Sequence, residues 1–122
     1  MTHLTEVERY RYAERLLAQR DPLGALQMLD PLLDTHAGDH GVQLLAARAY
    51  YHSAQLGRAR EALTALLDRD PTDHYVRFLL GRTLERSSRH EEALPHLRLA
   101  AAMNHDPEYA DSVARVERKL AA

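Results

Sequence analysis

The chain of 122 residues contains no cysteine and no tryptophan, and phenylalanine occurs in it only once. The lack of cysteine excludes disulfide bonds, thiolate metal sites and a cysteine nucleophile, and it is compatible with a reducing cytosol. The first ten residues, MTHLTEVERY, lack the basic start and the apolar core of a signal peptide. No apolar run approaches the roughly 20 residues that a membrane-spanning helix needs. We therefore expect a cytoplasmic protein that does not bind a membrane.

An excess of one charge sign is also lacking, because the formal net charge is only -2. Such a chain has no long-range attraction for nucleic acid, which usually requires a basic face. Acidic residues stand among the arginines in the middle of the chain, and this mixture is typical of a solvated surface. The arginines are Arg58, Arg60, Arg69, Arg82, Arg86 and Arg89, and the acidic residues are Glu61, Asp68, Asp70 and Glu85. We expect no nucleic-acid partner.

What the chain does contain is a repeat of small and large apolar residues at a constant interval. The recurring sets are Tyr12-Ala13, Ala46-Ala47 and Leu80-Gly81; Leu16, Tyr50 and Leu84; Ala25, Ala59 and Ala93; Leu29, Leu63 and Leu97; and Leu32, Leu66 and Ala100. An interval of about 34 residues is typical of an array of helical hairpins. The small residues allow a neighbouring helix to approach closely, and the large ones fill the space beside them. No stretch alternates like a strand, so we predict an all-α fold.

Helix-capping signals divide the chain into three units and a final helix. The signals are the capping-box spacings Thr5–Glu8 and Ser88–Glu91, the Asp-Pro pairs at residues 21–22 and 106–107, and Asp73. The predicted units are residues 6–39, 40–73 and 74–107, followed by a capping helix at residues 107–121, all in a single domain of residues 1–122.

Two prolines fall inside predicted helices, where proline lacks the backbone N–H and clashes with the preceding turn. We expect Pro31 to bend its helix or to end it early. We expect Pro95 to bend its helix or to delay its start.

The repeating positions resemble those of the tetratricopeptide repeat family, and the third unit resembles it best. That unit contains Leu80-Gly81, Leu84, Ala93, Leu97 and Ala100 at the family's positions. The chain departs from the family where Arg9, Gln43 and Arg77 stand in place of a tryptophan or another large residue. The family's closing proline is present only as Pro71. The resemblance implies a right-handed superhelical solenoid of three helix-turn-helix units with a C-terminal capping helix.

By this resemblance, the first helices of the units line a concave groove that holds a peptide or a helix of a partner protein. The groove candidates are Tyr10, Glu14, Leu17, Leu44, Arg48, Tyr51, Tyr75, Phe78, Arg82 and Glu85. Arg48 and Arg82 stand one repeat apart and would pair with carboxylates of the partner. The rings of Tyr51, Tyr75 and Phe78 would give apolar anchors. The alternative is that Leu44 and Phe78 belong to the core and that the arginines are part of a solvated surface.

One specific activity of the family is excluded by the residues themselves. Its chaperone-binding members hold a C-terminal carboxylate with Lys, Asn and Arg side chains. The matching positions here are Tyr10, Glu14, Leu45, Tyr75 and Leu79, none of which can do this, and Glu14 would repel a carboxylate.

Metal binding and catalysis find little support in the sequence. His36 and His40 are four residues apart, but Gly38 and Gly41 place them at a turn, and no third ligand is evident. The chain has no G-x-S-x-G motif, no glycine-rich phosphate loop and no H-E-x-x-H motif. We therefore expect no metal, no cofactor and no enzymatic activity.

Two functions remain, and they belong to different classes. The first is a protein–protein interaction scaffold or adaptor that binds a peptide or helix in the concave groove. The second is a structural homo-oligomer that assembles by stacking of arrays, in which the helices containing Pro31 and Pro95 would provide contacts on the outer face.

Overall fold

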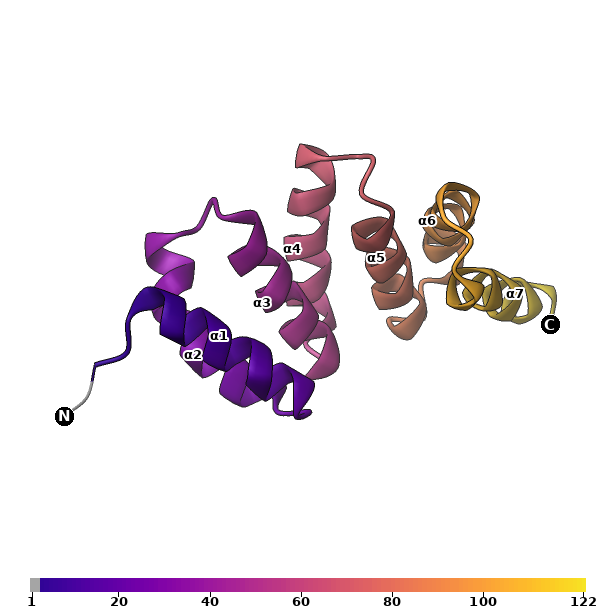
Figure 1. The fold of residues 1–122 in the computed structure, drawn as a ribbon. Helices are drawn as coiled ribbons and strands as arrows, with labels where there is room; N and C mark the ends of the chain where they lie inside the picture. Colours follow the sequence, from indigo (N-terminus) through magenta and orange to yellow (C-terminus); the bar gives the residue numbers. More distant parts are fainter. Residues whose placement is uncertain (1–2) are drawn as a thin grey trace. The chain divides into compact units, whose positions relative to one another are not determined.

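The computed structural model describes residues 3–122, and in that range it contains seven α-helices and no strand (Figure 1). The helices are α1 (Glu6–Ala18), α2 (Pro22–Thr35), α3 (His40–His52), α4 (Leu56–Arg69), α5 (His74–Arg86), α6 (His90–Met103) and α7 (Pro107–Ala121). The predicted all-α fold is confirmed. No helix in the described part of the chain is long and apolar enough to cross a membrane.

The constant interval of the sequence repeat is present in the helices themselves. Helices α1, α3 and α5 begin at residues 6, 40 and 74, and each has 13 residues. Helices α2, α4 and α6 begin at residues 22, 56 and 90, and each has 14 residues. The three units therefore have the same helix lengths and the same turn lengths, with no insertion between them.

Each turn between the two helices of a unit contains one residue in the left-handed region. The φ angle is 64° at Arg20, 60° at Ala54 and 60° at Ser88. The residue that follows each of them donates its backbone N–H to a carbonyl five residues earlier. These bonds run from Asp21 to Leu16, from Gln55 to Tyr50 and from Arg89 to Leu84, at 2.8, 2.8 and 2.9 Å. The turn geometry is thus the same in all three units, although none of the three residues is glycine.

The capping box predicted at Ser88 and Glu91 is wrong. Ser88 lies in the left-handed turn, and the N-cap of α6 is Arg89, whose side chain makes no capping bond. The spacing of Ser88 and Glu91 matched the motif, but the turn that all three units share places Ser88 one residue too early to cap α6.

The substitution Ala54→Gly is expected to raise the free energy of unfolding by about 1 kcal/mol. Glycine adopts positive φ without the steric cost that a β-carbon imposes, and the exposed Ala54 side chain contributes little packing. Urea unfolding measures the change. The matched control is Ala65→Gly at an exposed position inside α4, which should lower stability by about 1 kcal/mol. A loss of stability in both variants would contradict the prediction.

The other capping signals are confirmed. Glu8 N donates to Thr5 Oγ1, and Thr5 N donates to Glu8 Oε1, both at 3.1 Å, so the capping box before α1 is complete. Aspartate side chains cap α2, α5 and α7 from residues 21, 73 and 106, and a fourth caps α3 from residue 39.

The two internal prolines neither shorten nor delay their helices. Helix α2 continues through Pro31 to Thr35, and α6 begins at His90, before Pro95. The expected early end and late start are therefore wrong. Both prolines lie on exposed positions, where water can bind the carbonyl group that proline leaves without a partner one turn earlier.

The chain divides into two compact units, Met1–Ala62 and Leu63–Ala122, with the boundary inside α4. We call them the N-terminal unit and the C-terminal unit, and they are distinct from the three helix-turn-helix repeat units. A core cluster of the N-terminal unit joins α1, α2 and α3. Its buried members are Ala13, Leu17, Ala25, Leu29, Leu32, Val42, Leu45, Ala46 and Ala49. In the C-terminal unit, α6 packs against both α5 and α7.

Long polar side chains take the place of the family's tryptophan by bonding to the backbone. Arg9 donates to the carbonyl of Met28, in the second helix of its own unit, at 3.2 Å. Gln43 and Arg77 each donate to a carbonyl six residues earlier, of Ala37 at 2.5 Å and of Pro71 at 3.0 Å. These bonds connect the start of the first helix to its surroundings without a large apolar ring.

Helix α7 has the one-sided character of a cap. Its buried residues are Tyr109, Ser112 and Val116, while most of the remaining positions are exposed. The caps of α3 and α5, at residues 39 and 73, would place the next cap of the series at residue 107, but Asp106 caps α7 instead. Helix α7 is therefore one residue out of the repeat. With this shift, its three buried positions correspond to the buried Val76, Leu79 and Thr83 of α5.

Candidate functional site

Six of the predicted groove residues lie on α1 and α3 of the N-terminal unit, namely Tyr10, Glu14, Leu17, Leu44, Arg48 and Tyr51. Leu17 is buried in the core. Tyr10, Leu44 and Arg48 are partly buried, and Glu14 is exposed. Burial raises the pKa of the Tyr10 hydroxyl, the carboxylates of Glu14 and Asp39 raise it further, and Arg48 acts in the opposite direction. Glu14, Asp39 and Arg48 therefore all act electrostatically on the Tyr10 hydroxyl.

Arg48 has no partner for its guanidinium charge among the described residues. Its Nε atom is buried and makes no hydrogen bond to any group within residues 3–122. No ion pair joins it to a carboxylate of that part of the chain either. An unsatisfied buried donor costs about 1–3 kcal/mol, so the position is unfavourable for the chain alone.

A hollow of about 310 Å³ lies beside Tyr10. Its lining comes from α1, from the end of α2 and from the start of α3. The lining residues are Glu6, Val7, Tyr10, Leu32, His36, Asp39, Gly41 and Val42. Leu32 and Val42 are 2% and 5% exposed, whereas Val7 is 59% exposed. The hollow thus combines buried apolar residues with an accessible apolar side chain and several polar groups.

Gly41 leaves this hollow open. It is the second residue of α3, and the second residues of α1 and α5 are Val7 and Tyr75. A β-carbon on Gly41 would lie 3.0 Å from Tyr10 Oη and 3.3 Å from Asp39 Oδ1. The sequence contained the signal for this feature, namely a glycine where the other two units have a side chain, but its meaning depends on the position of Tyr10.

Four predicted groove residues lie in the C-terminal unit, and three of them, Tyr75, Phe78 and Arg82, have different environments. Tyr75 is 37% exposed. Phe78 is buried, and its ring stacks on Tyr109 of α7 with 4.2 Å between the ring centroids. Arg82 donates to Glu85 at 2.7 Å. Tyr75 therefore offers an accessible ring, Phe78 is a core residue of this unit, and Arg82 is engaged within the unit.

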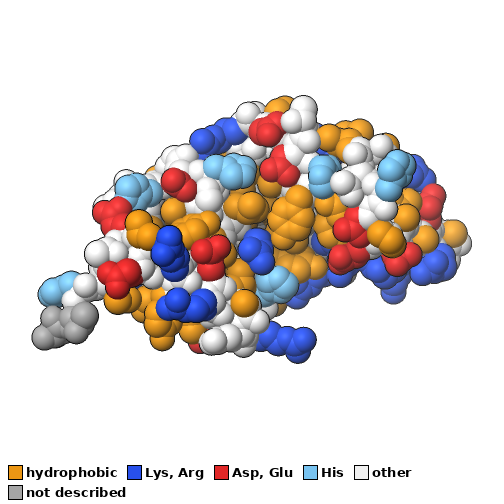
Figure 2. Space-filling view, in the orientation of Figure 1, with side chains coloured by type: hydrophobic (Ala, Val, Ile, Leu, Met, Phe, Trp, Pro, Cys, Tyr) orange, Lys and Arg blue, Asp and Glu red, His pale blue; other side chains and the backbone are white. Residues whose placement is uncertain are grey.

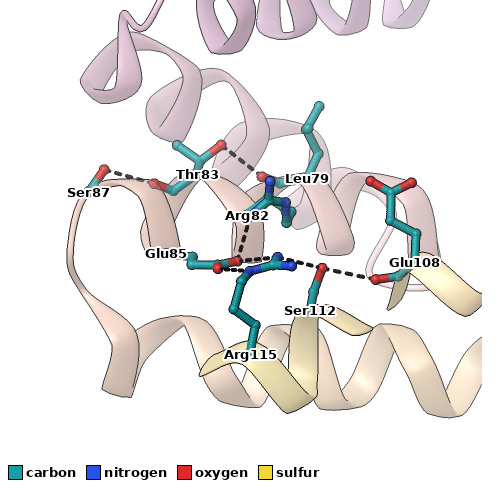
Figure 3. A network of polar contacts seen from close by, with 8 residues as sticks. All are labelled: Leu79, Arg82, Thr83, Glu85, Ser87, Glu108, Ser112 and Arg115. Atoms are coloured by element: carbon teal, nitrogen blue, oxygen red, sulfur yellow. Dashed lines mark hydrogen bonds and ion pairs between the residues drawn. The ribbon is translucent and has the colours of Figure 1, made fainter. Parts of the chain in front are cut away.

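Glu85 is the centre of a polar network between α5 and α7 (Figure 3). Arg115 of α7 donates to the Glu85 carboxylate with Nε and, at 3.0 Å, with Nη2. Arg82, which lies on α5 like Glu85, donates to the same carboxylate. The Glu85 side chain is only 10% exposed. Burial by itself raises the pKa of this carboxyl, but the hydrogen bonds from Arg115 and Arg82 hold the pKa below its ordinary value.

The ring of Tyr51, the remaining anchor candidate, is 8% exposed. Of the three anchor rings, only Tyr75 is therefore accessible. The spacing of the repeat identified positions on the first helices, but it did not distinguish partly open rings from buried ones.

The histidines form no recognisable metal centre. The His36 ring binds the Glu6 carboxylate, and His74 Nδ1 lies 2.9 Å from the Tyr109 hydroxyl. Within residues 3–122 no group of three or more His, Cys, Asp or Glu side chains is placed to hold a metal ion.

The charged side chains of the N-terminal unit are of both signs. Over this part of the chain, Figure 2 shows acidic, basic and hydrophobic side chains next to one another. The unit has seven arginines and eight acidic residues, counted over residues 1–62 of the sequence. Such a surface favours a partner with both charged and apolar groups.

Comparison with known families matches the chain to the tetratricopeptide repeat over residues 16–82 and again over residues 54–116. The two overlapping matches span most of the chain, from the end of α1 into α7. A search among curated proteins finds no match.

Proposed function

The chain belongs to the tetratricopeptide repeat family, whose repeats generally mediate protein–protein interaction, and we propose that its N-terminal unit binds a segment of another protein across α1 and α3. The chain would act as a cytoplasmic scaffold or adaptor. A catalytic role is disfavoured by the lack of nucleophile, phosphate-loop and zinc-protease motifs in the sequence.

The observation that carries the proposal is the contrast between Arg48 and Arg82. The two arginines stand at equivalent positions of α3 and α5. Arg82 is neutralised by Glu85 within its own unit, whereas the partly buried Arg48 has no carboxylate partner among the described residues. A carboxylate of a bound segment would supply the charge-assisted hydrogen bonds that Arg48 lacks.

The neighbours of Arg48 are consistent with a binding surface. Tyr10 and Leu44 are partly exposed, so each presents apolar area on one of the two helices. Tyrosine and arginine are enriched among the residues that dominate binding energies at interfaces. We propose that Tyr10, Leu44 and Arg48 contact the partner directly, with Glu14 at the edge of the surface.

The substitution Arg48→Glu is expected to weaken partner binding at least about tenfold, because it places a like charge against the partner's carboxylate. Affinity capture from cells followed by quantitative mass spectrometry identifies the partner, and titration of that partner measures the loss. The control is Arg11→Glu, the same charge change at an exposed position of α1 that corresponds to the buried Leu45 of α3. Equal binding by the two variants would refute a role of Arg48.

Self-assembly by stacking is the second candidate, and its support is the set of exposed apolar side chains, among them Leu23 at 60% and Leu99 at 45% exposure. The first helix argues against stacking at the N-terminal end. Where α3 has Val42, Leu45 and Ala49 in the core, α1 has Glu8, Arg11 and Arg15. Charged residues at these positions suit a helix that faces water rather than another array. Light scattering of the protein used for the titrations separates the two functions, because a monomer would exclude self-assembly as the main role.

A further inference from the structure

We propose that the hollow at Gly41 receives one aliphatic side chain of the bound segment, and that a cationic side chain next to it binds the carboxylates at the rim. This inference rests on the proposed function, since it describes what the same surface of the N-terminal unit would recognise. It goes further because it specifies the chemistry of the partner and assigns a role to Gly41, Asp39 and Val7.

The hollow is large enough to receive an aliphatic side chain. Its volume of about 310 Å³ is at the lower end of the roughly 300–1,000 Å³ typical of pockets for small molecules and cofactors. Leu32 and Val42 give it a buried apolar lining, and Val7 adds apolar surface that is 59% exposed. Covering Val7 and filling the hollow with an aliphatic group would remove apolar area from water on both partners.

The charge around the hollow selects the neighbour of that aliphatic group. Glu6 and Asp39 line the hollow, and Glu14 together with Asp39 raises the pKa of the Tyr10 hydroxyl. Among the described residues, Arg48 is the cation that acts on the Tyr10 pKa in the opposite direction. The His36 ring binds the Glu6 carboxylate. The carboxylates therefore outnumber the cations, which favours an arginine or lysine over an acidic residue at this end.

The two ends of the surface thus attract opposite charges. Gly41 and Arg48 are seven residues apart on α3, which corresponds to roughly 10 Å along a helix. A segment with a basic residue over the start of α3 and an acidic residue over Arg48 would satisfy both ends. The hollow would then receive an aliphatic side chain that lies between or beside the basic and the acidic residue of the segment.

Synthetic peptides test the chemistry with the full chain. The probe is a short peptide with one leucine between two arginines, and the comparison peptides replace the leucine by alanine or the arginines by glutamates. Amide chemical shifts of Gly41, Val42 and Tyr10 report binding even at dissociation constants of about 1 mM. We expect the leucine–arginine peptide to shift these amides, and each comparison peptide to bind at least about fivefold more weakly. Equal shifts with all three peptides, or none with the first, would overturn the proposal.

Two variants of the protein test the site. Gly41→Val fills the hollow and should weaken binding of the leucine–arginine peptide at least about tenfold, because the leucine then stays in water. Gly57→Val makes the same change at the second residue of α4, where a β-carbon meets nothing within 4 Å, and should leave binding unchanged. Asp39→Asn keeps a helix-capping side chain but removes one of the carboxylate charges, so it should reduce the preference for arginine over glutamate peptides.

The outcomes distinguish this inference from the proposed function. Loss of the captured partner in Arg48→Glu, with full binding of partner and peptide in Gly41→Val, would leave the proposed surface in place and refute the hollow. Peptide binding at Gly41 with unchanged partner capture in Arg48→Glu would refute the role of Arg48 and keep the hollow. Thermal unfolding of each variant confirms that it is folded.

Discussion

The substitution Gly81→Val is expected to lower the free energy of unfolding by about 3 kcal/mol, the upper part of the range for overpacked cores. A β-carbon on Gly81 would lie 2.6 Å from Cδ2 and 2.8 Å from Cγ of Leu97, and 3.3 Å from the Leu97 backbone nitrogen. Leu97 is 0% exposed, so its side chain has no space into which to turn. Helices α5 and α6 would have to separate to admit the new side chain. Urea unfolding measures the loss.

The control for this prediction is Gly57→Val, which adds the same side chain where nothing lies within 4 Å. It should change stability by less than about 0.5 kcal/mol. Combining Gly81→Val with Leu97→Ala should cost less than the sum of the two single changes, because the truncated leucine makes room for the added methyl groups. Equal stability of Gly81→Val and Gly57→Val would show that the helices do not approach as closely as the structure indicates.

The substitution Glu85→Gln is expected to lower the free energy of unfolding by about 2 kcal/mol at neutral pH. It leaves Arg82 and Arg115 without their shared counter-charge at a side chain that is only 10% exposed. Removing one partner of a buried pair costs about 3–5 kcal/mol, and the partial exposure of both arginines reduces this. The control is Glu117→Gln, whose pair with Arg98 is about half exposed on both sides and should contribute less than about 0.5 kcal/mol.

The pH dependence of the same pair follows from the direction of the pKa shift. Burial raises the pKa of Glu85, but the hydrogen bonds from Arg115 and Arg82 outweigh it, so the folded-state pKa lies below the ordinary value of 4.5. The folded chain therefore binds a proton less readily than the unfolded chain. The stabilisation is fully present above about pH 4.5 and is lost as the pH falls through the lower folded-state pKa.

Urea unfolding at a series of pH values measures this dependence. The difference in stability between the wild type and Glu85→Gln should stay constant from about pH 8 to pH 6 and should shrink below about pH 4.5. A difference that grows on acidification would contradict the assigned direction of the pKa shift.

Much of the helical framework could be predicted from the sequence because it depends on local signals. Thr5 with Glu8 and the aspartates at residues 21, 73 and 106 bond to backbone groups within a few residues, so the spacing alone located the helix starts. Local signals were misleading at Ser88, because this residue lies in the left-handed turn and not at the N-cap of α6. They also wrongly allowed an early helix end at Pro31 and a late helix start at Pro95, because spacing does not show that both prolines are exposed.

The candidate site was predictable only in part. The repeat placed Tyr10, Leu44 and Arg48 at comparable positions of the first helices, and Arg48 acts electrostatically on the Tyr10 hydroxyl. It could not reveal that Phe78 stacks on Tyr109, or that Arg82 is bound to Glu85, because both environments depend on contacts with distant residues or on side-chain conformation.

The sequence by itself determined the all-α fold, the constant repeat interval, the starts of α1, α2, α5 and α7, and the small residues that allow close packing. These properties depend on backbone hydrogen bonding and on side-chain size, which act over a few residues or at a fixed repeat position. Only the tertiary structure decided which groove residues are accessible, which arginine is already neutralised and what Gly41 leaves open. Burial and ion pairing depend on which residues folding brings together, and neither can be obtained from the spacing of a repeat.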